Sequence, residues 1–145
     1  MQKTLNDLFL EQLKDIYFAE KQIHRILPKM AKTAKISQLN EAFTAHREQT
    51  QRPQAMTCEA IKGVISEGEE TIDDFGEREV LDAGLVAAGH AVEHYEMAPY
   101  VALIAWAKQM NMTDAAALLS GTLQEEIKAD QRMSQIGTND NKKAA

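Results

Sequence analysis

Internal disulfide bonds and cysteine-based metal sites are excluded, because the 145-residue chain contains a single cysteine, Cys58. We interpret Cys58 as a small packing side chain rather than a reactive thiol. Proline and glycine are scarce, with three and seven residues, and no apolar run approaches the length of a membrane span. Residues 1–7 lack the apolar core and cleavage site of a signal peptide, so we expect a cytoplasmic protein with no membrane partner.

Basic residues are outnumbered, with 16 Lys and Arg against 22 Asp and Glu, which gives a net charge of −6. This balance argues against binding to nucleic acid or to an anionic membrane. The hydrophobic content of 44% is typical of a chain that buries a core. We therefore expect one globular domain, residues 1–137, followed by a disordered tail, residues 138–145.

Strand-like alternation is also lacking, and apolar residues recur instead at intervals of three and four. This spacing predicts four main helices at about 5–30, 37–50, 77–110 and 113–136. A short extra helix is expected at about 58–67, with Thr57 as its N-cap and residues 68–76 as an acidic connector to the next helix. Pro28 is expected to kink or fray the first helix, and Gly137 to end the last. The fold class is therefore all-α, a bundle with a short extra helix in its crossover.

Acidic residues interrupt the apolar stripes of three helices. At about 100° per residue, Glu93 and Glu96 share a face with Val86, Gly89 and Tyr100. A carboxylate in a core is costly without a compensating partner, so this face needs a cation or a hydrogen-bond network.

The same anomaly recurs on the other helices. Glu20 lies within the first stripe, Glu126 and Asp130 lie within the last, and His46 lies on the stripe of the second helix. Carboxylates with one or two imidazoles suit Fe or Mn rather than a structural zinc site. The alternatives are a buried ion-pair network or a wet subunit interface. Three other groups are expected in lesser roles: Asp82 at a helix start, and His90 and His94 flanking the stripe or exposed.

Four segments in this order, residues 15–22, 42–46, 92–96 and 123–130, resemble the YciE/YciF group of ferritin-like bacterial stress proteins. The resemblance implies a ferritin-like antiparallel four-helix bundle, a homodimer and a di-metal site of Fe or Mn. Residues 93–96 also resemble the third-helix motif of rubrerythrins, whose di-iron centre reduces peroxide. Carried over by position, the metal ligands implied are Glu20, Glu93, Glu96 and Glu126, with His46 and Asp130 as further candidates.

Two features depart from the resemblance. Gln49 stands where the family usually has Glu, and about four helical turns are lacking between Thr50 and Pro53, judged from bundle symmetry and the rise of about 1.5 Å per residue. Either a second subunit covers the resulting gap, or the sequence lacks residues that relatives use to complete the second helix.

Two functions follow from these observations. The first is a di-metal carboxylate protein that binds Fe or Mn and reacts with peroxide or oxygen. The second is a non-enzymatic structural or protein-interaction protein whose acidic stripe is paired with basic residues. The stripe positions themselves hold no Lys or Arg, which favours the metal.

Overall fold

The structure, a computed structural model, describes residues 4–49, 59–76 and 80–140. These residues form five α-helices and no strand: α1 (Leu5–Thr33), α2 (Ser37–Gln49), α3 (Glu59–Phe75), α4 (Leu81–Gln109) and α5 (Thr113–Asp140). The all-α fold class is thus confirmed. No helix in the described ranges is both long and apolar enough to cross a bilayer. Cys58 and the N-cap expected at Thr57 lie outside the described residues.

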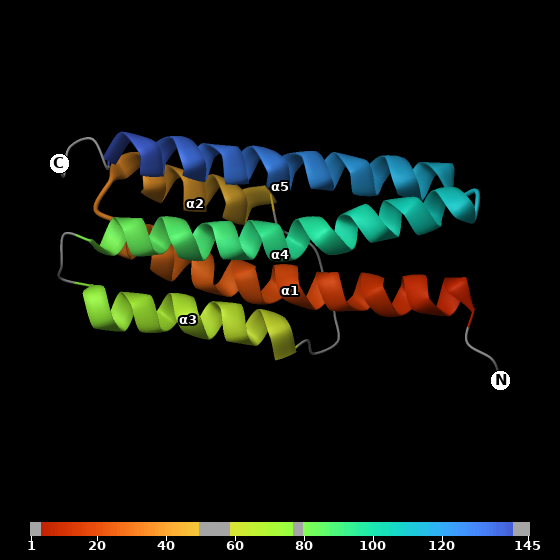
Figure 1. Cartoon of the computed structure of the whole chain (residues 1–145), viewed down its shortest axis with the longest axis horizontal. Coiled ribbons are helices and arrows are strands. Elements are labelled where there is room, and N and C mark those ends of the chain that lie inside the picture. The colour runs from red at the N-terminus through yellow and green to blue at the C-terminus, as the bar shows by residue number, and fades with distance from the viewer. Residues whose placement is uncertain (1–3, 50–58, 77–79, 141–145) are drawn as a thin grey trace.

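Three long helices, α1, α4 and α5, lie side by side along the molecule (Figure 1). Successive long helices run in opposite directions, and α4 and α5 form a tight hairpin with the most extensive helix-to-helix contact. The shorter α2 packs against α1 and α5, and α3 packs on the other side against α4 and α1. All five helices thereby pack around one interior.

The buried apolar side chains come from all five helices and fill this interior. Fully buried members include Ile16, Ile23, Phe43, Leu85 and Leu103. Their spacing by three, four and seven along each helix is the reason these segments coil as helices with one inward face.

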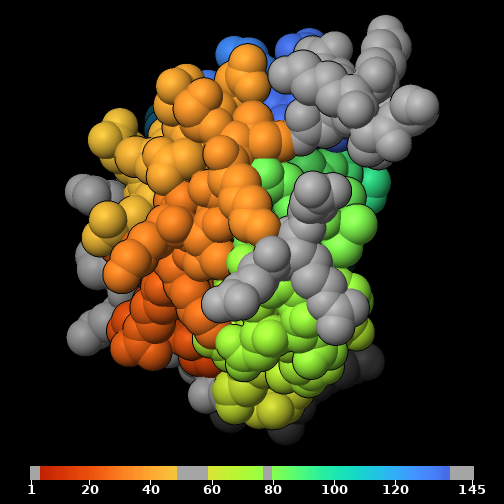
Figure 2. Space-filling view, turned by 90° about the vertical axis from the view of Figure 1, so that its left-hand side faces the viewer, coloured from red at the N-terminus to blue at the C-terminus, as the bar shows by residue number. Residues whose placement is uncertain are grey.

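Two carboxylates fix where helices begin. Asp7 and Thr4 form a capping box at the start of α1, in which the Thr4 hydroxyl accepts from the Asp7 amide at 3.2 Å. Asp82, on α4, is buried and accepts hydrogen bonds from the backbone amides of Lys35 and Ile36 at 2.9 and 3.0 Å. These amides precede α2 directly, so α4 caps α2 across the bundle. Figure 2 shows this end of the molecule, where the turn between α1 and α2 lies beside the start of α4.

The prediction of a connector at residues 68–76 is wrong, because α3 continues to Phe75. Gly68 and Ile72 are buried and continue the spacing that begins at Ile61. A Cβ placed on Gly68 would lie 3.7 Å from Ala88 of α4, so the helix packs closely there. The acidic residues of this segment occupy the outer face of a helix rather than a loop.

The expected end of the last helix at Gly137 is also wrong, because α5 runs to Asp140. No glycine in the described ranges has a positive φ, so Gly137 takes helical geometry instead of a left-handed stop. Likewise α1 continues to Thr33, beyond Pro28, and its end is closed by the Ala34 amide donating to Met30. The boundary expected between domain and tail remains a prediction, and residues 141–145 lie outside the description.

The contact between α3 and α4 generates a prediction about glycine. A Cβ on Gly84 would lie 2.5 Å from the Thr71 methyl group, whereas a Cβ on Gly121 in α5 would meet nothing within 4 Å. Glycine-to-alanine substitution in an open helix position stabilises by about 1 kcal/mol, but overpacking costs about 1–3 kcal/mol. We expect Gly121→Ala to raise the free energy of unfolding, measured in urea. The free energy of unfolding of Gly84→Ala should be lower than that of Gly121→Ala by about 1–3 kcal/mol. Equal stabilisation by both variants would contradict the packing.

Candidate metal centre

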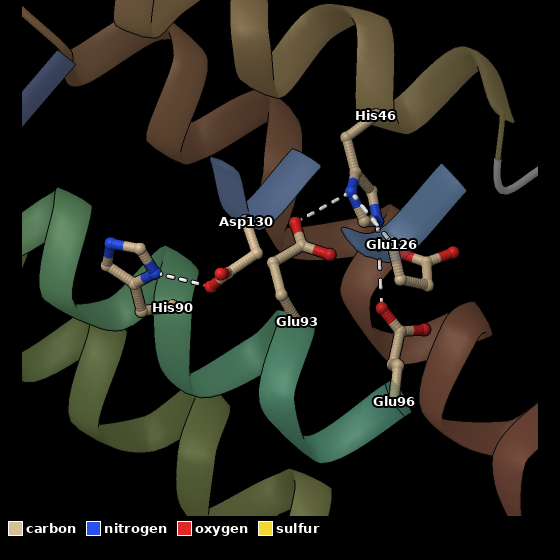
Figure 3. A network of polar contacts seen from close by, with 6 residues as sticks. All are labelled: His46, His90, Glu93, Glu96, Glu126 and Asp130. Atoms are coloured by element: carbon tan, nitrogen blue, oxygen red, sulfur yellow. Dashed lines mark hydrogen bonds and ion pairs between the residues drawn. The ribbon is translucent and has the colours of Figure 1, made fainter. Parts of the chain in front are cut away.

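Four side chains from three helices converge in the interior. His46 projects from α2, Glu93 and Glu96 from α4, and Glu126 from α5 (Figure 3). One potential ligand atom from each lies within 4.8 Å of those of the others. The sequence predicted these four as ligands, and the structure brings them together.

His46 stands at the centre of the group. Its Nδ1 lies 2.9 Å from Glu93 Oε1 and 3.8 Å from Glu126 Oε2, and its Nε2 lies 3.7 Å from Glu96 Oε2. Both ring nitrogens therefore face carboxylates. A neutral imidazole and the carboxylates around it together form a set of donor atoms for a metal ion.

The cluster is sealed from solvent and lacks basic partners. His46 is 3% exposed, Glu93 2%, Glu96 0% and Glu126 7%, and no Lys or Arg is buried in the described part of the chain. Neither carboxylate oxygen of Glu96 has a hydrogen-bond partner there, and one oxygen each of Glu93 and Glu126 also has none. Buried polar atoms are almost always satisfied, so these oxygens indicate a missing partner.

Burial sets the protonation of this group. It raises the pKa of Glu93 to about 7, with a hydrogen bond to Glu126 opposing the rise and the charge of Asp130 adding to it. Burial raises the pKa of Glu126 to about 8, and that of Glu96 well above its usual range, with neighbouring carboxylates reinforcing the latter. Burial lowers the pKa of His46, so that the imidazole is neutral at neutral pH.

Glu20, the fifth predicted ligand, lies beside the cluster on α1 and is half-buried. Its carboxylate accepts a hydrogen bond from the hydroxyl of Tyr100, which follows Glu96 by one helical turn on α4. The charge of Glu20 adds to the rise in the pKa of Glu96 and opposes the lowering of the pKa of His46. Glu20 therefore borders the four convergent groups, but it is not one of them.

Asp130, the sixth candidate, does not join the buried group. Its Oδ1 lies 2.5 Å from Nδ1 of His90 and 3.1 Å from Nε2 of His94, both on α4. Asp130 follows Glu126 by four residues, which turns it about 40° around the helix. That rotation takes it from the inward stripe to the edge of the interface between α4 and α5.

A small pocket of about 90 Å³ lies between α2 and α5, and His46 forms part of its wall. The small side chains of Ala42, Ala45 and Ala129 line the pocket, together with Lys128 and Arg132. His46 is the one member of the buried cluster that the pocket reaches.

Sequence reasoning underestimated two sets of residues. His90 and His94 were expected only as flanking or exposed groups, yet they form a cluster with Asp130. Their spacing by four on one helix was a usable signal. The role of Asp82 as a cap for α2 had no signal in the sequence, because the amides that it binds are more than 40 positions away.

The fold and this cluster define an all-helical protein with a buried site of glutamate and histidine, suited to hold a metal. The chain matches the family described as a domain of unknown function, DUF892, over residues 4–55 and 51–145. It belongs to that family. This match and the similarity to YciF together confirm the family that the sequence predicted.

Individual relatives agree. The protein is 38% identical to YciF of Escherichia coli K12 over 159 residues, which covers 98% of this chain and 96% of YciF. The crystal structure of the E. coli stress protein YciF matches with a TM-score of 0.91 and 37% identity, covering 98% of this chain and 99% of that chain. YcfI from Rhodopseudomonas palustris, provisionally called a structural protein, matches with a TM-score of 0.86 and 39% identity, covering 91% and 94%.

The comparison also bears on the length of the second helix. About 142 residues of this chain, 98% of 145, are spread over 159 aligned positions, so about 17 positions have no counterpart here. The family match is divided at residues 51–55. Seventeen helical residues span about 25 Å, which would bring the 13-residue α2 close to the length of α1.

The pKa shifts predict how the stability of the metal-free protein depends on pH. In the folded state the pKa values of Glu93 and Glu126 are about 7 and about 8, above the usual value of 4.5 for a glutamate. The folded state therefore holds protons that the unfolded chain has released, and stability falls as the pH rises from about 5 through about 8. We expect a loss of roughly 1–3 kcal/mol per group, measured by urea unfolding in chelator.

Glu93→Gln and Glu126→Gln should each flatten this profile. Glu48→Gln is the matched control, because Glu48 is an exposed residue of α2 that contributes to none of these pKa shifts. A wild-type profile that rises or stays level between pH 5 and 8 would contradict the shifts.

Proposed function

We propose that the protein is a ferritin-like di-metal carboxylate protein that binds Fe or Mn at Glu20, His46, Glu93, Glu96 and Glu126. The observation that carries the proposal is the fully buried Glu96, whose carboxylate oxygens have no hydrogen-bond partner in the described part of the chain. A metal ion is the partner that such a carboxylate lacks.

An ion-pair network is the competing explanation for buried acids, and the structure weighs against it. Such a network needs buried Lys or Arg, and none is buried among the described residues. Without a cation the carboxylates take up protons, as the raised pKa values of Glu93 and Glu126 show. Protons stand in for the missing positive charge.

The charge balance favours two ions rather than one. Four glutamates, Glu20, Glu93, Glu96 and Glu126, carry four negative charges when ionised, and His46 is neutral. One divalent ion would leave two negative charges in a buried site, whereas two divalent ions neutralise it. Helical bundles with carboxylates on facing helices are known to bind two metal ions side by side.

A bound pair of Fe or Mn ions would supply two redox equivalents for the reduction of peroxide or oxygen. The protein's own residues supply the rest. Glu93 and Glu126 release their protons when the ions bind, the alanine-lined pocket beside His46 admits a small molecule, and burial keeps bulk water away. We place this activity in the cytoplasm.

Metal binding should stabilise the fold. Because the ions bind the folded state, Fe(II) under anaerobic conditions or Mn(II) should raise the melting temperature. At a metal concentration a hundredfold above Kd, the free energy of unfolding should rise by about 2.7 kcal/mol. Glu93→Gln should remove most of this gain, while the metal-free variant should be as stable as the parent or more stable, because a crowded carboxylate has gone. Differential scanning calorimetry with and without metal measures both effects.

Elemental analysis of protein purified without chelator measures the stoichiometry, for which we expect two ions per chain. Glu48→Gln again serves as the control and should keep the metal-dependent shift. Melting temperatures that metal leaves unchanged, or shifts equally in the parent and in Glu93→Gln, would refute the metal centre.

A second function is a non-enzymatic structural or protein-interaction role. The observation that favours it is the similarity to YcfI, provisionally called a structural protein, over 91% of the chain. The two functions are separated by hydrogen peroxide consumption in the Fe- and Mn-loaded protein. Metal binding without peroxide or oxygen turnover would support the structural role.

We also propose that the protein forms a homodimer. In the described part of the chain seven large apolar side chains are exposed, and five of them lie toward the end of the molecule where α1 begins and α4 meets α5: Leu8, Leu10, Val101, Met112 and Leu118. The described part of α2 ends before that half is reached (Figure 1). A second copy of the chain, packed by twofold symmetry, would cover these side chains.

Light scattering coupled to gel filtration tests the dimer. Leu118, 69% exposed, is the most exposed of the set, so Leu118→Gln should shift the mass toward the monomer. Val80→Gln changes a side chain of similar exposure, 56%, at the opposite end of the molecule and should leave the mass of the parent unchanged. A parent that is monomeric at micromolar concentration would refute the dimer.

A further inference from the structure

A second cluster of ligand groups lies at the surface, outside the buried centre. His90 and His94 are one helical turn apart on α4, and Asp130 faces them from α5. The ring centroids of the two histidines are 6.1 Å apart, so both rings occupy the same side of the helix. A dashed line joins the ring of His90 to Asp130 in Figure 3.

We propose that His90, His94 and Asp130 form a separate, mononuclear site for a late divalent transition-metal ion such as zinc. Two imidazoles and one carboxylate make three protein ligands, which is the number found in open zinc sites that keep a position for water. The buried centre is rich in oxygen, whereas this site is rich in nitrogen. Imidazole ligands suit Zn, Cu, Ni and Fe, whereas carboxylate and water ligands suit Mn.

The distances suit this use. Asp130 Oδ1 lies 2.5 Å from His90 Nδ1 and 3.1 Å from His94 Nε2. Ligand atoms around a tetrahedral zinc, with bonds of about 2.0–2.1 Å, are about 3.3 Å apart. An entering ion therefore needs to widen the contact to His90 by about 0.8 Å and that to His94 by about 0.2 Å. The two nitrogens lie within 4.8 Å of each other. Rotation of the Asp130 side chain alone can provide this, since a single carboxylate oxygen makes both contacts.

Exposure gives the ion a way in. The side chain of His94 is 65% exposed, that of His90 is 29% exposed and that of Asp130 is 20% exposed. The site is thus open to solvent at His94 and anchored in the interface of α4 and α5 at Asp130. Metal bound here would join the two long helices that make the most extensive contact of the fold.

Zinc titration of the full chain by isothermal calorimetry tests the proposal. We expect a class of zinc sites, one per chain, whose Kd rises at least about tenfold in His90→Ala and in His94→Ala. That class should persist in Glu96→Gln, which removes a ligand of the buried centre only. His24→Gln is the matched histidine control, because His24 lies on α1 and belongs to neither cluster, and should also keep the site.

Imidazole NMR signals supply a second readout. Zinc should perturb His90 and His94 at one equivalent and leave His24 unchanged. The proposal is overturned if His90→Ala and His94→Ala bind zinc like the parent, or if Glu96→Gln abolishes every zinc site. Neither outcome decides the buried centre, because Fe(II) and Mn(II) stabilisation in His90→Ala measures that centre independently.

Discussion

Buried glutamates without a buried cation are the constraint on which this structure depends. Glu93, Glu96 and Glu126 lie together at the centre of a helical bundle, where ionised carboxylates repel one another and cannot be hydrated. Apolar residues at these positions would pack more stably. These glutamates therefore destabilise the interior, and the raised pKa values of Glu93 and Glu126 reflect this. This is the pattern expected where stability is exchanged for a site.

The helices and the inward phase of the acids could be predicted because both depend on local spacing. Glu93 and Glu96 are three apart on one helix, so their shared face follows from helix geometry alone. Asp130 was grouped with Glu126 because a spacing of four is nearly in phase. The remaining 40° places it in another cluster, and only the packing of α5 against α4 decides that.

Helix ends were harder to predict than helix faces. The acidic run at 68–76 was assigned to a connector because charge and glycine dominate it, yet two buried residues, Gly68 and Ile72, hold it in α3. Gly137 continues α5 because nothing there requires a left-handed residue. Composition describes the solvent-facing side of such segments, whereas their length is set by what lies beneath them.

The hydrogen bonds of Asp82 give the bundle a common origin for two of its helices. From Asp82 to Glu93 is eleven residues along α4, and from Ile36 to His46 is ten residues along α2, or about 16 and 15 Å of helix. The two helices run in the same direction and act as two rods of nearly equal length joined at one end (Figure 1). His46 and Glu93 consequently arrive at the same height, and a change in the joint would displace one metal-ligating helix lengthwise against the other.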